Sequence, residues 1–258
     1  MGPIASVASV DALDALRQAP ASAGVFVDFD GTLSPIVLAA ADARALPGAG
    51  EVLLRLASVF GRVAVVSGRP VSYLVEHLPE EIELHGLYGL EWRIDGELGE
   101  RASSERWRPV IDAVVEEAER ALVGAGVDVE DKGLSLTLHF RRVPDAEDAA
   151  VDWARATAAR TELYLRAAKM SLELHPPVEV DKGTVVDERS EGLSAVAYIG
   201  DDLGDLPAFE ALDRLAERGL AAVKVAVRTP DVADALTQQA HLLVDGPEGA
   251  LDLLRSLA

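Results

Sequence analysis

Five short runs of apolar, mostly β-branched or small residues recur along the chain, and helical stretches separate them. The runs cover residues 24–27, 62–66, 195–199, 221–227 and 241–244, and the helical stretches cover residues 48–58, 71–77, 206–215, 229–236 and 248–257. Consecutive apolar side chains indicate strands that are buried on both faces. Such strands alternating with helices predict an α/β fold with a parallel sheet, in which functional residues gather at the carboxyl ends of the strands.

The middle of the chain follows a different pattern. Residues 88–99 suggest a hairpin with its turn at Asp95-Gly96. After it come a helix at 104–123, strands at 127–129 and 134–140, a helix at 146–159, and strands at 162–166 and 171–175. This α-β-β-α-β-β order predicts a small α+β domain over residues 97–176, inserted into a core domain formed by residues 1–96 and 177–258.

The composition argues against several classes of partner. The 258 residues include 24 Lys and Arg against 44 Asp and Glu, a formal net charge of −20. Because binding to nucleic acid or anionic lipid needs clustered basic residues, we expect no nucleic-acid and no membrane partner. The chain has no cysteine, which excludes a disulfide or a thiolate nucleophile. Residues 1–23 lack the pattern of a signal peptide or membrane span, so we expect a cytoplasmic location. We also expect the protein to be a monomer.

Polar residues that suit phosphate chemistry stand at the ends of predicted strands or at the start of a helix. They are Asp28 and Asp30 after the first run, Ser67 after the second, Lys182 at a helix start, and Asp201 and Asp205 after the third run. Two carboxylates this close at a buried strand end repel each other, and a bound cation relieves the repulsion. Together the residues supply a nucleophile, a proton donor, donors for phosphoryl oxygens, and ligands for Mg2+.

Each of these elements alone has a simpler explanation. An Asp-x-Asp pair is often a solvated turn, a serine before a helix is often a cap, and a lone lysine is usually a surface charge. The acidic residues from Asp201 to Asp205 could cap a helix. All four elements in this order, each at the end of a strand or the start of a helix, favour phosphoryl transfer instead.

The order and spacing of the four elements resembles the haloacid dehalogenase-like (HAD) phosphatase superfamily. The resemblance implies a Rossmann-like core in which Asp28 attacks phosphorus and becomes an aspartyl phosphate. It implies that Asp30 protonates the leaving alcohol and then activates the water that hydrolyses the intermediate. It also implies that Ser67, Gly68 and Lys182 hold the phosphoryl group.

The same resemblance implies a metal ion and a cap domain. Mg2+ would be held by Asp28, the backbone carbonyl of Asp30 and Asp201, with Asp205 as a further ligand or a supporting partner. The inserted domain falls after Ser67 and before Lys182, which is the position of a C2-type cap in this superfamily.

Several stretches are similar to the trehalose-6-phosphate phosphatase family in particular. They are residues 28–36 (DFDGTLSPI), 67–69 (SGR), 89–91 (GLE), 138–141 (LHFR), 169–176 (KMSLELHP) and 181–183 (DKG). The similarity implies hydrolysis of trehalose 6-phosphate, a small sugar-phosphate substrate, to trehalose and phosphate. The chain departs from the family pattern at Tyr88, which replaces a His, and at Gly204 and Leu206, which replace Thr and Glu.

The similarity also points to residues that would bind the sugar, namely Arg69, Glu91, His139, Arg141, Lys169 and Glu173. The period of two in a strand places Lys169, Ser171 and Glu173 on one face, opposite Met170, Leu172 and Leu174. Arg69 and Glu91 could equally form a structural ion pair. The polar side chains of the cap could equally lie on a solvated outer face.

Three other functions fit parts of the pattern. Another C2-capped HAD phosphatase, acting on sucrose phosphate, a glycosyl-phosphoglycerate or a simpler sugar phosphate, would share the chemistry and differ in the cap. A phosphosugar mutase would form the same intermediate but protect it from water. A non-catalytic binder of sugar phosphate would not need Asp28, Asp30, Lys182 and Asp201 to be intact, and all four are present.

Overall fold

The computed structural model describes residues 7–37, 40–168, 170–229 and 232–258. The chain divides into two compact units, which we call the core unit (Met1–Gly99 with Val180–Ala258) and the cap unit (Glu100–Glu179). The sequence placed the division slightly earlier, at residues 96–97 and 176–177. The first difference has a simple cause, since residues 97–99 belong to a strand that extends the core sheet.

Eight of the described strands form the sheet of the core unit, in the order β12-β11-β10-β1-β2-β3-β4-β5. Their bounds are β1 Ala23–Val27, β2 Arg62–Val66, β3 Glu83–Gly86, β4 Glu91–Ile94, β5 Glu97–Glu100, β10 Ala195–Gly200, β11 Ala221–Arg228 and β12 Leu242–Asp245. The pairs from β12 to β3 are parallel, and β4 joins β3 in the antiparallel direction. The expected parallel-sheet α/β fold is therefore confirmed.

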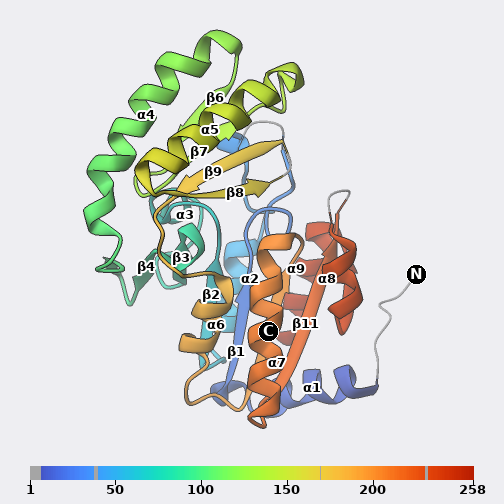
Figure 1. The fold of residues 1–258 in the computed structure, drawn as a ribbon. Helices are drawn as coiled ribbons and strands as arrows, with labels where there is room; N and C mark the ends of the chain where they lie inside the picture. The colour runs from blue at the N-terminus through green and yellow to red at the C-terminus, as the bar shows by residue number, and fades with distance from the viewer. Residues whose placement is uncertain (1–6, 38–39, 169, 230–231) are drawn as a thin grey trace. The chain divides into compact units, whose positions relative to one another are not determined.

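Helices cover both faces of this sheet, as the alternation of side chains along β1 requires. Val25 and Val27 pack with one set of helices, whereas Phe26 packs with the other. The first set contains α1 Val7–Gln18, α2 Ala49–Ala57, α3 Val71–Val75 and α9 Gly246–Leu257, and the second contains α6 Lys182–Arg189, α7 Leu206–Glu217 and α8 Asp234–Gln239. Figure 1 shows α7 (orange) in front of the sheet, between the strands labelled β1 and β11. The central strands β1, β2 and β10 are thus almost wholly buried, as their apolar runs predict.

Two features of the core unit differ from the sequence prediction. Strand β3 was missed because polar residues interrupt its apolar pattern, and Glu83 is accommodated there by Arg189, whose Nε and Nη2 donate to its carboxylate at 2.7 and 2.9 Å. The helix expected at residues 229–236 is wrong in position, since α8 begins at Asp234. Thr229 instead follows β11 directly, at the carboxyl edge of the sheet.

The cap unit is an antiparallel sheet with two helices on one face (Figure 1). Its strands run in the order β6-β7-β9-β8. The elements are α4 Arg108–Leu122, β6 Asp128–Asp131, β7 Leu136–His139, α5 Glu147–Thr161, β8 Tyr164–Ala168 and β9 Ser171–His175. Leucines of β7 and β9 pack beneath the helices, so the alternate residues of these strands form a polar face.

Among the described residues, no helix is both long and apolar enough to cross a membrane.

Candidate active site

The central position of β1 brings two acidic elements together. β1 lies between β10 and β2, with Val27 opposite Ile199 of β10. Asp28 and Asp201 therefore follow neighbouring parallel strands at the same edge of the sheet. With Asp205, they form a buried acidic group. One carboxylate oxygen from each of the three residues lies within 4.8 Å of the other two. Oxygen donors of this kind suit a hard divalent cation.

Lys182 contacts two of the three carboxylates in this acidic group. It is the first residue of α6, whose start is fixed by a capping box between Asp181 and Thr184. Its Nζ lies 2.8 Å from Oδ1 of Asp28 and 2.6 Å from Oδ1 of Asp205. Burial alone lowers the pKa of a lysine, but the two carboxylates outweigh burial and hold the pKa of Lys182 well above its usual value. Lys182 is therefore a fixed positive charge beside Asp28.

Asp205 organises the turn after β10. Its Oδ1 accepts from the Tyr198 hydroxyl at 2.6 Å as well as from Lys182, and its Oδ2 accepts from the backbone N–H groups of Asp201 and Asp202 at 2.8 and 3.0 Å. The Asp205 side chain is fully buried. Both of its oxygens are thus occupied by hydrogen bonds that hold the turn and aim Lys182.

The ionised forms of the other two carboxylates, Asp28 and Asp201, are disfavoured in this group. Burial raises the pKa of Asp28 well above its ordinary value, and the neighbouring carboxylates of Asp205 and Asp201 oppose the lowering effect of Lys182. Burial, followed by the charges of Asp205 and Asp202, raises the pKa of Asp201 to about 8. A cation bound among these oxygens would favour their ionised forms. The donor set and its charge therefore fit a divalent metal ion.

The turn after β1 reaches this site because it contains a glycine. Gly31 has a φ of 78°, and a Cβ atom built on it would lie 2.1 Å from Oδ2 of Asp201. The backbone N–H groups of residues 32, 33 and 34 all point to the carbonyl of Phe29, which folds the turn tightly. Only glycine combines this backbone conformation with such a close approach.

Ser67 and Gly68 lie at the end of β2, as expected. The Ser67 N–H donates to the carbonyl of His85 at 2.9 Å, and its buried hydroxyl oxygen accepts from the Arg69 N–H at 3.1 Å. A Cβ at Gly68 would lie 2.8 Å from Cζ of Tyr88, and Nζ of Lys182 lies 6.0 Å from the centroid of the same ring. Tyr88 therefore lies beside two of the expected phosphate-binding elements.

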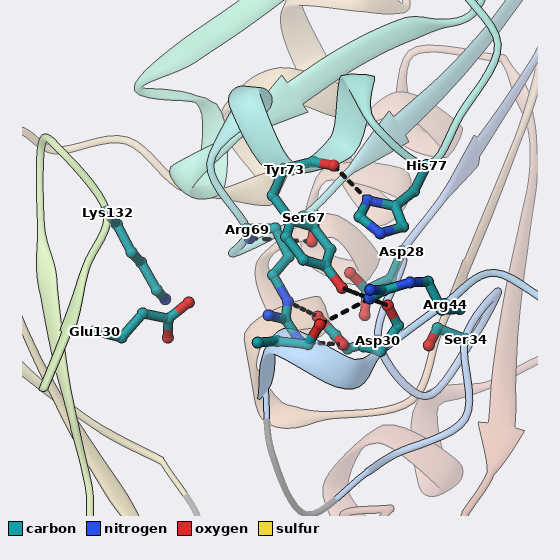
Figure 2. A network of polar contacts seen from close by, with 12 residues as sticks. Asp28, Asp30, Ser34, Arg44, Ser67, Arg69, Tyr73, His77, Glu130 and Lys132 are labelled. Atoms are coloured by element: carbon teal, nitrogen blue, oxygen red, sulfur yellow. Dashed lines mark hydrogen bonds and ion pairs between the residues drawn. The ribbon is translucent and has the colours of Figure 1, made fainter. Parts of the chain in front are cut away.

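Asp30 and Arg69, two residues expected to act on the substrate, are joined to each other (Figure 2). Nε and Nη2 of Arg69 donate to the two carboxylate oxygens of Asp30 at 2.7 and 2.8 Å. Glu91 accepts from the backbone N–H of Val71 at the start of α3. The carboxylate of Asp30 is thus engaged by a guanidinium, while Asp28 is engaged by Lys182.

Two of the expected sugar-binding residues have defined partners within the cap unit. Nε2 of His139 lies 2.8 Å from Oε2 of Glu130. Glu173 is buried and accepts from the Ser135 hydroxyl at 2.7 Å. Arg141 is half-buried just after β7, and Lys169 lies outside the described residues.

Glu173 belongs to a charged network on the polar face of the cap sheet. Nζ of Lys132 lies 3.8 Å from Oε1 of Glu173, and Nη1 of Arg166 lies 3.4 Å from its Oε2. Burial would raise the pKa of Glu173, but these two cations and the Ser135 hydroxyl hold it below its usual value. The leucines on either side of Glu173 pack into the cap core, so the predicted alternation of β9 is confirmed there.

Some residues of these networks were missed in the sequence. Thr229, which donates to Oδ2 of Asp201 at 3.2 Å, follows a predicted strand and could have been found by the same edge rule. Lys132 lies in a turn between two cap strands, where a basic residue looks like a surface charge. Tyr198 lies inside the apolar run of β10 and carries no separate signal.

Comparison with known proteins relates the chain to one family. The trehalose-phosphatase family model matches residues 26–240. The trehalose-phosphate phosphatase of Mycobacterium tuberculosis (strain H37Rv) is 32% identical over 264 residues, which cover 96% of this chain and 65% of that protein. The enzyme of the same name from Mycobacterium leprae is 30% identical over 203 residues, or 73% of this chain and 47% of that protein.

Other matches extend the range of lengths and the structural comparison. A protein named uncharacterized glycosyl hydrolase MT2062, also from M. tuberculosis, is 32% identical over 73% of this chain but only 15% of its own length. The chain thus spans between 15% and 65% of these curated relatives. The crystal structure of a trehalose-6-phosphate phosphatase related protein has a TM-score of 0.78 at 24% identity, over 91% of this chain and 96% of that one.

A second solved structure shows the same fold over the full chain. The C-terminal domain of the Candida albicans trehalose-6-phosphate phosphatase has a TM-score of 0.77 at 23% identity, covering 100% of this chain and 98% of that one. The family match covers well over half of the chain. The chain therefore belongs to the trehalose-phosphatase family.

Proposed function

We propose that this protein is a Mg2+-dependent phosphatase that hydrolyses trehalose 6-phosphate to trehalose and phosphate. The observation that carries the proposal is the buried contact between Asp28 and Lys182 inside the acidic group. A carboxylate held beside a fixed ammonium, with further carboxylates for a cation, suits attack on a phosphate monoester. Membership of the trehalose-phosphatase family supports the choice of substrate.

In the proposed reaction, an oxygen of Asp28 forms a bond to phosphorus while the bond from phosphorus to the sugar oxygen breaks. The carboxyl of Asp30 gives its proton to that leaving oxygen. Asp30 then takes a proton from a water molecule, which attacks phosphorus and releases phosphate from Asp28. The Lys182 ammonium, the Ser67 hydroxyl and the backbone N–H of Gly68 are suited to hold phosphoryl oxygens.

Asp28 and Asp201, with the backbone carbonyl of Asp30, would hold Mg2+. Such an ion supplies positive charge that stabilises the phosphoryl oxygens and favours the ionised form of the nucleophile. Asp205 fits a different task, because its two oxygens already accept four hydrogen bonds. We assign it to orienting Lys182 and the Asp201 backbone.

The polar face of the cap sheet is suited to bind the hydroxyl groups of the sugar. His139, Arg141 and Glu173 supply charged and hydrogen-bonding groups on or beside this face, and Lys132 and Arg166 keep Glu173 ionised. A ligand that leaves buried charged groups without hydrogen-bond partners binds weakly, because the lost hydrogen bonds are costly in a buried site. The cap therefore provides the chemistry for choosing among sugar phosphates.

Phosphate release across a panel of sugar phosphates tests the function. The purified protein should release phosphate from trehalose 6-phosphate faster than from sucrose 6-phosphate, a glycosyl-phosphoglycerate or glucose 6-phosphate, and EDTA should abolish the activity until Mg2+ is restored. Asp28→Asn should be inactive with every member of the panel. Strong turnover of another sugar phosphate with none of trehalose 6-phosphate would contradict the substrate, and isomerisation without phosphate release would indicate a mutase.

A cytoplasmic location and a monomeric state remain predictions from the sequence. Light scattering of the purified chain would test the second of them.

A further inference from the structure

Arg69 and Asp30, which pair with each other, differ in how exposed their side chains are. Asp30 is the more exposed partner, with 37% of its side chain accessible, whereas the Arg69 side chain is 9% accessible. A half-exposed aspartate can adopt several rotamers. The two hydrogen bonds from one planar guanidinium select a single orientation of the carboxylate.

Arg69 is itself held in place from several directions. Its guanidinium carbon lies 4.6 Å from the centroid of the Tyr73 ring. Its backbone N–H donates to Oγ of Ser67 at 3.1 Å, and its carbonyl accepts from the Leu87 N–H at 2.9 Å. The fork that grips Asp30 is therefore anchored to the end of β2, which also carries Ser67.

The Tyr73 ring that supports Arg69 is also fixed (Figure 2). It stacks on His77 with a centroid distance of 4.3 Å and an angle of 21°, and it meets Phe29 edge-on at 6.0 Å. Nδ1 of His77 lies 2.7 Å from the Tyr73 carbonyl, and the Tyr73 hydroxyl donates to the carbonyl of Ala43. The ring is a rigid support for the guanidinium rather than an adaptable surface.

We propose that Arg69, supported by Tyr73, is the positioning residue that places the carboxyl of Asp30 for proton transfer to the leaving oxygen. The proposal rests on the proposed function for the role of Asp30. When Asp30 carries the proton, one of its oxygens can remain on Arg69 while the other turns to the substrate. Arg69 then acts through Asp30 and does not read the sugar.

The test compares two leaving groups in the first turnover. The alkoxide of a sugar needs a proton to leave, whereas 2,4-dinitrophenolate is stable without one, so only the first depends on Asp30 as an acid. Rapid-quench measurements with Mg2+ give trehalose formation from trehalose 6-phosphate, and a stopped-flow burst gives dinitrophenolate formation from 2,4-dinitrophenyl phosphate. Single-turnover rates exclude the later hydrolysis of the intermediate, which needs Asp30 for both substrates.

Arg69→Lys keeps the charge but loses the fork. We expect it to slow the first turnover of trehalose 6-phosphate by about 100-fold and that of the aryl phosphate by less than about 5-fold, the size of a general-acid contribution. Tyr73→Ala should act in the same direction with a smaller ratio. Arg120→Lys is the matched control, since Arg120 is an exposed arginine of α4 that lies 3.5 Å from Glu116; it should leave the ratio of the two rates unchanged.

Equal losses for both substrates in Arg69→Lys would overturn the proposal, and so would a higher KM for the sugar phosphate with an unchanged first-turnover rate. Thermal unfolding of each variant separates these results from misfolding, and Tyr73→Ala tests the proposal if Arg69→Lys does not fold. If the protein turns over a different alkyl phosphate, that substrate replaces trehalose 6-phosphate and the proposal is still tested. Absence of turnover with every alkyl phosphate would overturn both this proposal and the proposed function.

Discussion

Replacing Asp201 with asparagine should stabilise the metal-free protein at alkaline pH. In the folded protein, burial and then the neighbouring carboxylates raise the pKa of Asp201 to about 8 from an ordinary value of 3.8. Ionisation of Asp201 at pH 8 therefore opposes folding when no cation is bound. Asparagine removes that charge and keeps an amide oxygen that can accept from Thr229, which now donates to Oδ2 of Asp201 at 3.2 Å.

The size and sign of the effect follow from the pKa difference. Because the pKa of Asp201 is raised in the folded state, its contribution to stability is fully present below about pH 4 and is lost as the pH rises towards 8. Each unit of pKa difference corresponds to about 1.4 kcal/mol, so a shift of about four units sets an upper limit of roughly 5–6 kcal/mol. Structural relaxation and partial compensation reduce this, and we expect Asp201→Asn to gain about 2–4 kcal/mol at pH 8 and less than about 1 kcal/mol at pH 5.

Urea unfolding followed by tryptophan fluorescence measures the effect. Wild type and Asp201→Asn are compared in EDTA at pH 5 and pH 8, and again at pH 8 with added Mg2+. Mg2+ should stabilise the wild type by mass action and should stabilise the variant much less. Glu217→Gln, a change at an exposed residue in the last turn of α7, controls for the loss of one negative charge.

An equal difference between the two proteins at both pH values would refute the electrostatic reasoning. So would a variant that is less stable than wild type in EDTA at pH 8, because then the carboxylate stabilises the metal-free fold. The result bears on function, since it shows whether stability is sacrificed to keep oxygen ligands ready for a cation.

Three further changes test other parts of the site. Lys182→Met leaves buried carboxylates without their cation, so it should lower the free energy of unfolding by about 3–5 kcal/mol at pH 7 and remove phosphate release; a loss below 1 kcal/mol in urea unfolding would be inconsistent with a buried pair. Gly204→Thr adds a Cβ that would lie 3.3 Å from Cε1 of Tyr88. It should lower the free energy of unfolding by about 1–3 kcal/mol, which a thermal-shift assay would detect. The double variant with Tyr88→Ala should recover part of this stability. Glu173→Gln should raise the KM for trehalose 6-phosphate by about 10-fold or more while leaving aryl phosphate hydrolysis nearly unchanged; parallel changes with both substrates would exclude a role in sugar binding.

The sequence was most informative where chemistry coincides with the end of a strand. Asp28 and Asp201 follow apolar runs of the chain, and the parallel sheet alone brings such positions to one edge. Lys182 could be placed at a helix start from its position before Gly183 and Thr184. These three positions needed no knowledge of side-chain packing, and the structure brings them together.

The pairing of side chains was not visible in the sequence. The sequence did not indicate that the guanidinium of Arg69 contacts Asp30, 39 residues earlier in the chain. Such a contact depends on the exact path of two turns after neighbouring strands. The residues of one turn do not indicate where the other turn runs. Similarly, the four hydrogen bonds on Asp205 involve Tyr198, whose place in an apolar run indicates only burial.

The transfer of a phosphoryl group to Asp28 is tested most directly by trapping the intermediate. The protein with Mg2+ is mixed with 32P-labelled trehalose 6-phosphate, quenched in acid within milliseconds, reduced with borohydride and digested for mass spectrometry. We predict transient labelling of the protein and, after reduction, homoserine in place of aspartate at position 28, with neither in Asp28→Asn. Rapid phosphate release with no labelled protein at any time point, or reduction at a different residue, would contradict the account.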